Sequence, residues 1–455
     1  MKNGKLIAIL LFGFAFRLIA LDQSLWLDEA IVAKVISTHS YLEILRYFSP
    51  HDFHPPLYYF IMKALTGVFG LSEIALRIPS VLFALGSVAV LYFGFGMWPA
   101  LFLAVNPLFI YYSQEARMYA MATLFITLVL YLLKENPTLP SPIRGCKIKE
   151  GRKSSLPYQG RIKVGFLLGL FLSLAFMTFY GTIFFSLAVL MYLFFKKQYR
   201  IVLTTIYCLL ATIILLSPLL YGQLLNAKLS LASVVNWNLV LGNVTLKNFI
   251  LIFIKFMSGR ISFEPKIVYF GLAGLWSLFT WLFVVKGGLK DRKLSFLFLC
   301  CLLAVVCWSF VSPMLQYFRL LFLLPLVMVL LDRGANNAVI KIIIVITFIA
   351  WSLAYLLNST QHREDWKSLA QKLDSKFPVV MITDARDPLD YYSRRFTIYD
   401  LRRIREMPKK FKEIQVINYN MEIYGIDYRK KLQEKGYRMV KEYTVRGIAY
   451  EIYSK

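Results

Sequence analysis

The sequence predicts a polytopic α-helical membrane protein that ends in a small soluble α/β domain. The chain has 455 residues, is 58% hydrophobic and has a mean hydropathy of +0.58, which is too apolar for a soluble protein of this length. After Asn358 the composition changes to 21 basic and 14 acidic residues, with short alternating helix and strand patterns. We therefore expect a membrane part at 1–357 and a soluble domain at 358–455.

Eleven apolar runs in the first part are long enough to cross about 30 Å of hydrocarbon. They lie near 5–21, 74–96, 97–113, 117–133, 163–179, 180–195, 201–220, 267–285, 294–311, 317–331 and 340–357. Lys and Arg favour cytoplasmic connections, and a cytoplasmic N-terminus places most of the basic connections there. An odd number of spans then makes the C-terminal domain extracytoplasmic, on the outer side of the cell membrane.

This scheme leaves two long outer connections, 22–73 and 221–266. Residues 56–70 are apolar enough to be another span, but counting them would invert everything that follows and move most basic connections outside. We interpret them as a membrane-dipping helix, and the amphipathic stretch 246–257 in the same way. The segment 134–163, rich in Pro, Ser and Lys, is typical of a cytosolic linker.

The last 98 residues carry a mixed pattern of short elements. Expected helices are Asp365–Lys376, Asp387–Arg394 and Tyr428–Glu434, and expected strands are Pro378–Thr383, Ile414–Asn418, Tyr437–Val445 and Ile448–Tyr453, the last two as a closing hairpin. These elements predict an α/β cap on the outer face.

Charge and cysteine content exclude several classes of function. The net charge of +26 could suggest nucleic acid, but basic loops beside apolar spans set topology and contact anionic lipids, so we expect membrane lipids as partners and no nucleic acid. The cysteines, Cys146, Cys208, Cys300, Cys301 and Cys307, lack metal-type spacing. No zinc site or disulfide framework is implied.

Two adjacent acids, Asp28 and Glu29, stand a few residues beyond the first apolar run. Acids favour the first turn of a helix, so a solvated helix start is one interpretation. Charge beside lipid is costly, however, and is usually functional where it is kept. The pair is therefore a candidate site.

Unusual polar residues gather on the outer face of the membrane part. They are Asp28, Glu29, His54, Arg77, Glu115, Arg117, Arg260, Glu264 and Arg319. Taken singly, Glu115 could be a helix-start charge and Arg117 a lipid-phosphate anchor. Their density at one face favours a site for chemistry.

Four motifs in order resemble those of a known family. They are Trp26–Ala30 (WLDEA), His54–Tyr59 (HPPLYY), Ser72–Phe83 (SEIALRIPSVLF) and Tyr111–Ala120 (YYSQEARMYA). The first 130 residues resemble polyprenyl-phosphate-sugar-dependent glycosyltransferases of the GT-C type, related to protein O-mannosyltransferases and lipid A aminoarabinose transferases. The similarity is looser later, at Tyr317–Pro325 and Asp365-Trp366.

The resemblance implies a transferase that moves a monosaccharide, with inversion, from a polyprenyl-phosphate donor to a protein, lipid or glycan acceptor at the outer face. It maps the family's essential acid to Asp28 and a second acid to Glu115. Such transfer needs a base for the acceptor hydroxyl and cationic groups for the departing phosphate. Arg117 and Arg319 suit the second role because a guanidinium binds phosphate in two directions.

Other residues have alternative roles. His54 stands where some relatives carry lysine, so it would contact phosphate when protonated or as a neutral donor; it could also be a polar helix start. Glu29 could support the loop, hold Asp28 in position, or contact substrate. Tyr58, Tyr59, Tyr111 and Tyr112 could line a sugar or polyprenyl groove, although aromatic residues are common at any membrane interface.

Metal use and catalysis itself have alternatives. Oligosaccharyl relatives hold a divalent ion with several acids, and Asp28 with Glu115 could do so, but the outer domain lacks a WWDYG-like segment, so we expect no obligatory cofactor. A transporter or binding protein for polyprenyl-linked sugar is the alternative function. It would place polar residues along the spans near the midplane. A catalytically dead relative that binds a partner is a third interpretation.

Overall fold

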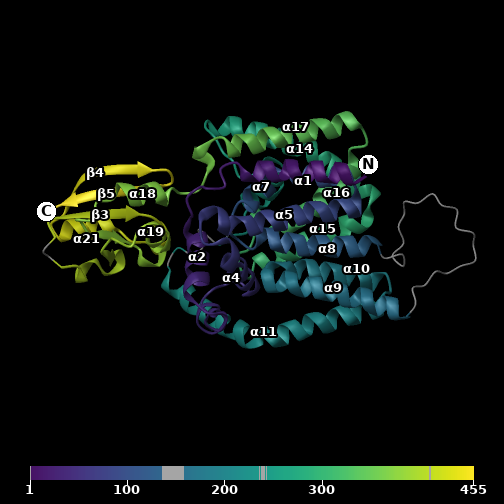
Figure 1. Cartoon of the computed structure of the whole chain (residues 1–455), viewed down its shortest axis with the longest axis horizontal. Coiled ribbons are helices and arrows are strands. Elements are labelled where there is room, and N and C mark those ends of the chain that lie inside the picture. The colour runs from purple at the N-terminus through teal and green to yellow at the C-terminus, as the bar shows by residue number, and fades with distance from the viewer. Residues whose placement is uncertain (1, 136–157, 235, 237–240, 242, 409–410) are drawn as a thin grey trace, which may run out of the picture.

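The computed structural model describes the whole chain except residues 1, 136–157, 235, 237–240, 242 and 409–410. Figure 1 shows a bundle of helices along the long axis with an α/β unit at one end and the N-terminus at the other. Most of the predicted linker 134–163, including Cys146, lies outside the described residues.

Five helices in the described part of the chain are long and apolar enough to cross a membrane. They are α5 (Glu73–Phe95), the Tyr199–Ala227 portion of α11 (Tyr199–Ser233), α14 (Lys266–Lys290), α15 (Arg292–Ser309) and α17 (Ala338–Leu356). Each coincides with a predicted span. The remaining predicted spans fall on other helices, so the total of eleven stays a prediction. These are α1 (Lys2–Leu18), α6 (Met97–Val105), α7 (Pro107–Ser113), α8 (Tyr119–Glu135), α9 (Tyr158–Thr178), α10 (Ile183–Phe195) and α16 (Leu324–Gly334).

Two predicted spans are interrupted. The run 97–113 breaks between α6 and α7 because Pro107 has no backbone N–H to donate, and the Asn106 side chain instead caps α7 by accepting from the N–H groups of Leu108 and Phe109, both at 3.0 Å. The run 317–331 begins with a 3₁₀ turn, Tyr317–Leu323, before α16. Helix α11 also continues past the predicted end at residue 220, so the second outer connection is partly helical.

Helices α4 (Leu57–Phe69) and α13 (Leu246–Ser258) have 13 residues each. At 1.5 Å per residue each is about 20 Å long, too short for about 30 Å of hydrocarbon. Helix α10 on a predicted span has the same length, so the membrane-dipping interpretation of both segments stays a prediction. Helix α4 packs against α2 (Leu27–Thr38) and α5, and Figure 1 shows α2 and α4 at the end of the bundle that faces the α/β unit.

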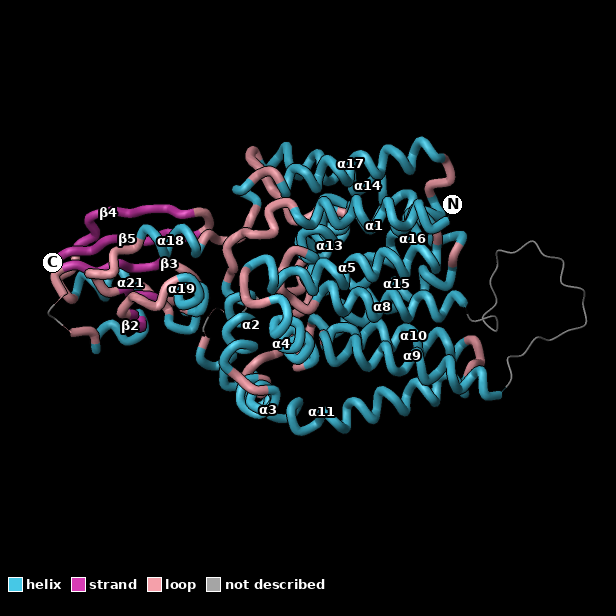
Figure 2. Tube along the Cα trace, in the orientation of Figure 1, coloured by secondary structure: helices cyan, strands magenta, loops and turns pink. Residues whose placement is uncertain are grey.

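The C-terminal part forms a five-stranded mixed sheet in the order β2-β1-β3-β5-β4, drawn in magenta in Figure 2. The strands are β1 (Val379–Met381), β2 (Ile398–Asp400), β3 (Glu413–Asn418), β4 (Arg438–Val445) and β5 (Ile448–Ser454). Strand β1 pairs in parallel with β2 and β3, and the other pairs are antiparallel. The helices are α18 (Trp366–Lys372), α19 (Asp387–Tyr392), α20 (Met421–Tyr424) and α21 (Tyr428–Glu434). Sequence analysis missed β2 and α20, which have three and four residues.

The α/β unit docks on the first outer connection. Leu27, at the start of α2, packs against the hydrophobic cluster that contains the fully buried Trp366. The backbone N–H of Leu25 donates to the Tyr392 hydroxyl at 2.8 Å, and Lys34 pairs with Asp387 at 2.7 Å. The segment after α17 contacts the same connection, because the Arg363 guanidinium lies over the Trp26 ring.

Candidate active site

Glu29 forms a fully buried ion pair with Arg77 of α5. Arg77 donates from Nη2 to Oε2 at 2.6 Å and from Nε to Oε1 at 2.9 Å, and the backbone N–H of Ala116 donates to Oε1 at 2.7 Å. Buried charges persist only when paired and hydrogen-bonded. Glu29 thus joins α2, α5 and the α7–α8 connection, and of its three predicted roles this geometry favours loop support.

Asp28 has the opposite environment. Its side chain is 33% exposed, and its Oδ2 lies 3.2 Å from Nη2 of Arg117. Consecutive side chains on a helix point about 100° apart, so one carboxylate can be buried while its neighbour stays accessible. The structure therefore gives the two acids different partners, and Asp28 is the one available to a substrate.

Arg117 and His54 connect Asp28 to Asp52, an acid that sequence analysis did not single out. The same Nη2 atom lies 3.3 Å from Nε2 of His54, whose Nδ1 lies 2.9 Å from Oδ1 of Asp52. The Tyr59 hydroxyl donates to Oδ2 of Asp52 at 2.7 Å. Burial acts to raise the pKa of Asp52, but the contacts with His54 and Tyr59 outweigh it and hold that pKa below its usual value. The only signal for Asp52 in the sequence was its position two residues before His54.

Glu115 lies in the connection between α7 and α8 and is buried. Arg363 donates to its Oε1 from Nε at 2.9 Å and from Nη2 at 2.8 Å, and Arg260 lies 3.9 Å from the same oxygen. Burial raises the pKa of Glu115 to about 7, against the opposing charge of Arg363. Its Oε2 atom is buried without a hydrogen-bond partner among the described residues.

Arg363, which sequence analysis missed, comes from the segment between α17 and α18. Its guanidinium lies 3.8 Å from the centre of the Trp26 ring, and Nε of Arg446 donates to its backbone carbonyl at 2.8 Å. Burial acts to lower the pKa of Arg363, but Glu115 outweighs it, so the guanidinium stays charged. The α/β unit thus holds a residue of the site in place.

The four predicted tyrosines are all buried. The Tyr111 hydroxyl accepts a hydrogen bond from Arg260, and the Tyr112 ring packs against Tyr119 and Phe318. The Tyr59 hydroxyl donates to Asp52, and the Tyr58 ring packs edge-on against the Tyr59 ring. Tyr111 borders the charged groups around Glu115, because the guanidinium groups of Arg260 and Arg363 lie 4.9 and 5.7 Å from the centre of its ring.

The hydrogen bonds of the Arg319 side chain go to backbone carbonyl groups. Its Nη1 donates to the carbonyl groups of Leu241 and Pro313 at 3.0 and 2.9 Å. Among the described residues no hydrogen bond joins it to Asp28 or Glu115, so Arg319 is not part of the hydrogen-bonded group of Asp28 and Arg117.

In the part of the sequence that the structure describes, no three His, Cys, Asp or Glu side chains come together to hold a metal ion, and metal independence stays a prediction.

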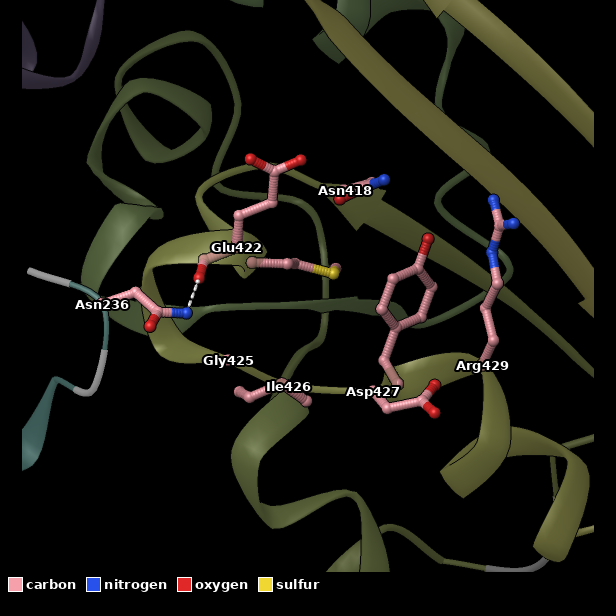
Figure 3. A pocket seen from close by; sticks show the side chains of 9 residues that line it. Asn236, Asn418, Glu422, Gly425, Ile426, Asp427 and Arg429 are labelled. Atoms are coloured by element: carbon pink, nitrogen blue, oxygen red, sulfur yellow. Dashed lines mark hydrogen bonds between the residues drawn. The ribbon is translucent and has the colours of Figure 1, made fainter. Parts of the chain in front are cut away.

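A separate pocket of about 620 Å³ lies in the α/β unit (Figure 3). Asn236, from the second outer connection, closes one side of it and donates from Nδ2 to the Glu422 carbonyl at 2.8 Å. None of the predicted site residues lines this pocket. The candidate active site is therefore the cluster around Asp28, at the junction of the bundle and the α/β unit.

The helical bundle with its α/β unit shares its fold with solved structures of two GT-C glycosyltransferases. Crystal structures of ArnT from Cupriavidus metallidurans, bound to undecaprenyl phosphate and in the apo state, both match with a TM-score of 0.56, at 11% and 10% identity, and the matches cover 99% of this chain and 98% of ArnT. The apo oligosaccharyltransferase of Archaeoglobus fulgidus matches with a TM-score of 0.50 and 10% identity over 88% of this chain and 64% of that one. No protein-family model and no curated protein matches the sequence.

Proposed function

We propose that this chain is a glycosyltransferase that acts at the outer face of the cell membrane. It moves a monosaccharide from a polyprenyl-phosphate donor to a protein, lipid or glycan acceptor. One observation carries the proposal: Asp28 presents an accessible carboxylate beside Arg117 at the capped end of the bundle. The fold shared with ArnT, which was crystallised with undecaprenyl phosphate, supports the class of donor.

In this proposal Asp28 is the base for the acceptor. The acceptor hydroxyl gives its proton to the Asp28 carboxylate while its oxygen bonds to the anomeric carbon. The bond from that carbon to the phosphate oxygen breaks, and attack from the opposite side inverts the configuration. The departing lipid phosphate is stabilised by Arg117, which is buried and charged. Arg319, whose side chain bonds to backbone carbonyl groups, is the other candidate for the same role.

Glu115 is the second acid of the proposal. Arg363 occupies one of its oxygens, while Oε2 is buried without a partner among the described residues. A buried acceptor of this kind is costly unless a ligand completes it. We assign Oε2 to a hydroxyl group of the bound sugar, with Tyr111 and Tyr112 as the neighbouring wall.

The proposed orientation places this site outside the cell. The N-terminus and the α/β unit lie at opposite ends of the bundle, which fits a cytoplasmic N-terminus and an extracytoplasmic C-terminal domain (Figure 1). Labelling of a cysteine introduced at Arg395, an α/β-unit residue, from outside intact cells tests it. Labelling from the cytosolic side alone would contradict the orientation.

Mass spectrometry of surface glycoconjugates tests the activity whichever sugar is transferred. Cells without the gene should lack one monosaccharide, and the wild-type gene should restore it. Asp28→Asn should fail to restore it at an unchanged protein level, whereas Asp22→Asn, an exposed acid six residues earlier, should restore it fully. Restoration by Asp28→Asn would contradict the proposed function.

A further inference from the structure

The hydrogen-bond chain around His54 has a defined direction. Arginine can only donate, so Nε2 of His54 accepts from Nη2 of Arg117 at 3.3 Å. Nδ1 of His54 must then carry the proton and donate to Asp52 at 2.9 Å. In this arrangement His54 is neutral, and the nitrogen that faces Arg117 has no proton to offer to a phosphate.

Asp52 and the backbone around it are held in place from two helices. Nε2 of Gln223, on α11, lies 2.8, 2.7 and 3.2 Å from the carbonyl oxygens of Ser49, Asp52 and His54, which share its two protons. The Tyr59 hydroxyl, on α4, occupies the second oxygen of Asp52. The Asp52 carboxylate therefore fixes the orientation of the His54 imidazole, and the His54 side chain remains 28% exposed.

The charged and titratable groups around His54 act in opposite directions. Asp52, on the same loop, favours a charged imidazole, and Arg117, from the α7–α8 connection, opposes it. Asp28, on α2, pairs with Arg117 and offsets part of the charge of that guanidinium. Tyr59, on α4, donates to Asp52, and Tyr180, in the turn before α10, donates to Oε1 of Gln223 at 2.8 Å.

We propose that Asp52 makes His54 a proton-dependent phosphate ligand, so that binding of the anionic donor takes up one proton. The inference rests on the proposed function and concerns the same site. Arg117 turns its Nη2 from His54 to the phosphate, Nε2 of His54 takes a proton from solvent, and the new N–H donates to a phosphate oxygen. Asp52, which balances the imidazolium charge, is the positioning residue.

The sign of the resulting pH dependence follows from the proton count. The bound state holds one proton more than the free state, so donor affinity is highest at low pH and falls as pH rises. A lysine at this position would keep its charge across the whole range and would remove the dependence. The Asp52–His54 pair thus converts a fixed phosphate contact into one that responds to the pH outside the cell.

Equilibrium binding to the full-length protein in nanodiscs tests this inference. The probe is the methyl ester of undecaprenyl phosphate, a phosphodiester with one constant negative charge. Between about pH 5.5 and about pH 8.5 the dissociation constant of the wild type should rise about 10- to 100-fold, the value of one charge-assisted hydrogen bond. The same dissociation constant at both ends would overturn the inference.

Four variants separate the proton-dependent contact from general damage. His54→Lys should bind tightly at every pH, and His54→Gln weakly at every pH. Asp52→Asn should lose most of the gain at low pH, because the imidazolium lacks its counter-charge. His51→Gln, in the same loop but exposed and bonded to the Tyr47 carbonyl, should keep the wild-type slope.

The outcomes distinguish this inference from the proposed function. Tight binding without pH dependence in the wild type, or a wild-type slope in His54→Gln, would overturn the proton-coupled contact and leave the transferase proposal standing. A wild type that binds the phosphodiester at no pH and restores no monosaccharide to the cell surface would overturn both.

Discussion

Two neighbouring acid–arginine pairs differ in almost every respect. Glu29 and Arg77 are fully buried and share two short hydrogen bonds, whereas Asp28 is one-third exposed and approaches Arg117 at 3.2 Å. The first pair holds three segments together, and the second leaves its carboxylate available. The difference shows that one acidic dipeptide can supply a structural anchor and a reactive group at adjacent positions.

The comparison predicts its largest stability effect at the buried pair. Arg77→Met or Glu29→Met alone should lower the free energy of unfolding by about 3–5 kcal/mol, because each leaves an unpaired buried charge. The double variant should recover a large part of this loss. Thermal unfolding of the purified protein in detergent measures all three. Single variants within about 1 kcal/mol of the wild type would break the distinction between the pairs.

Because of Glu115, we expect the transfer rate to fall on the acidic side of its pH profile, and we call this fall the acidic limb. Its pKa is about 7, so the carboxylate form, which can accept a hydroxyl hydrogen bond at Oε2, is lost as pH falls through 7. At saturating donor the rate should therefore fall about tenfold for each pH unit well below that pKa. Arg363→Met removes the favourable charge, so the limb should move to higher pH. The same limb in Glu115→Gln would contradict this assignment.

The smallest predicted effect lies at the docking surface of the α/β unit. Lys34 pairs with Asp387 across this surface, and the Lys34 side chain is 53% exposed. Lys34→Ala should change the free energy of unfolding by at most about 1 kcal/mol and leave transfer unchanged. Thermal unfolding and the glycoconjugate assay measure the two effects. A loss comparable to that of Arg77→Met would mean that this surface is as critical as the buried pair.

Much of the fold could be predicted because long apolar runs and short alternating patterns are local signals. Helices α5, α14 and α17 begin close to the starts of the predicted spans, and β3 and β5 lie where the alternation indicates. The continuation of α11 to Ser233 was missed because its last turns are polar enough to resemble a loop.

The candidate site was predicted less completely because its contacts join distant segments. The motifs marked Asp28, His54, Glu115 and Arg117, but Arg363 reaches Glu115 across 248 positions of the sequence. Nothing local indicates that contact. Asp52 was nearer, yet its importance appears only once His54 and Tyr59 are seen to share it.

The transfer rate of Asp28→Asn, measured beside its unfolding temperature, tests the central claim most directly. In liposomes that contain the polyprenyl-phosphate sugar identified from the surface glycoconjugates, the variant should lose at least about 100-fold in rate. Its unfolding temperature should stay close to that of the wild type, because Asp28 is partly exposed. Wild-type transfer by Asp28→Asn would contradict the account of the exposed acid.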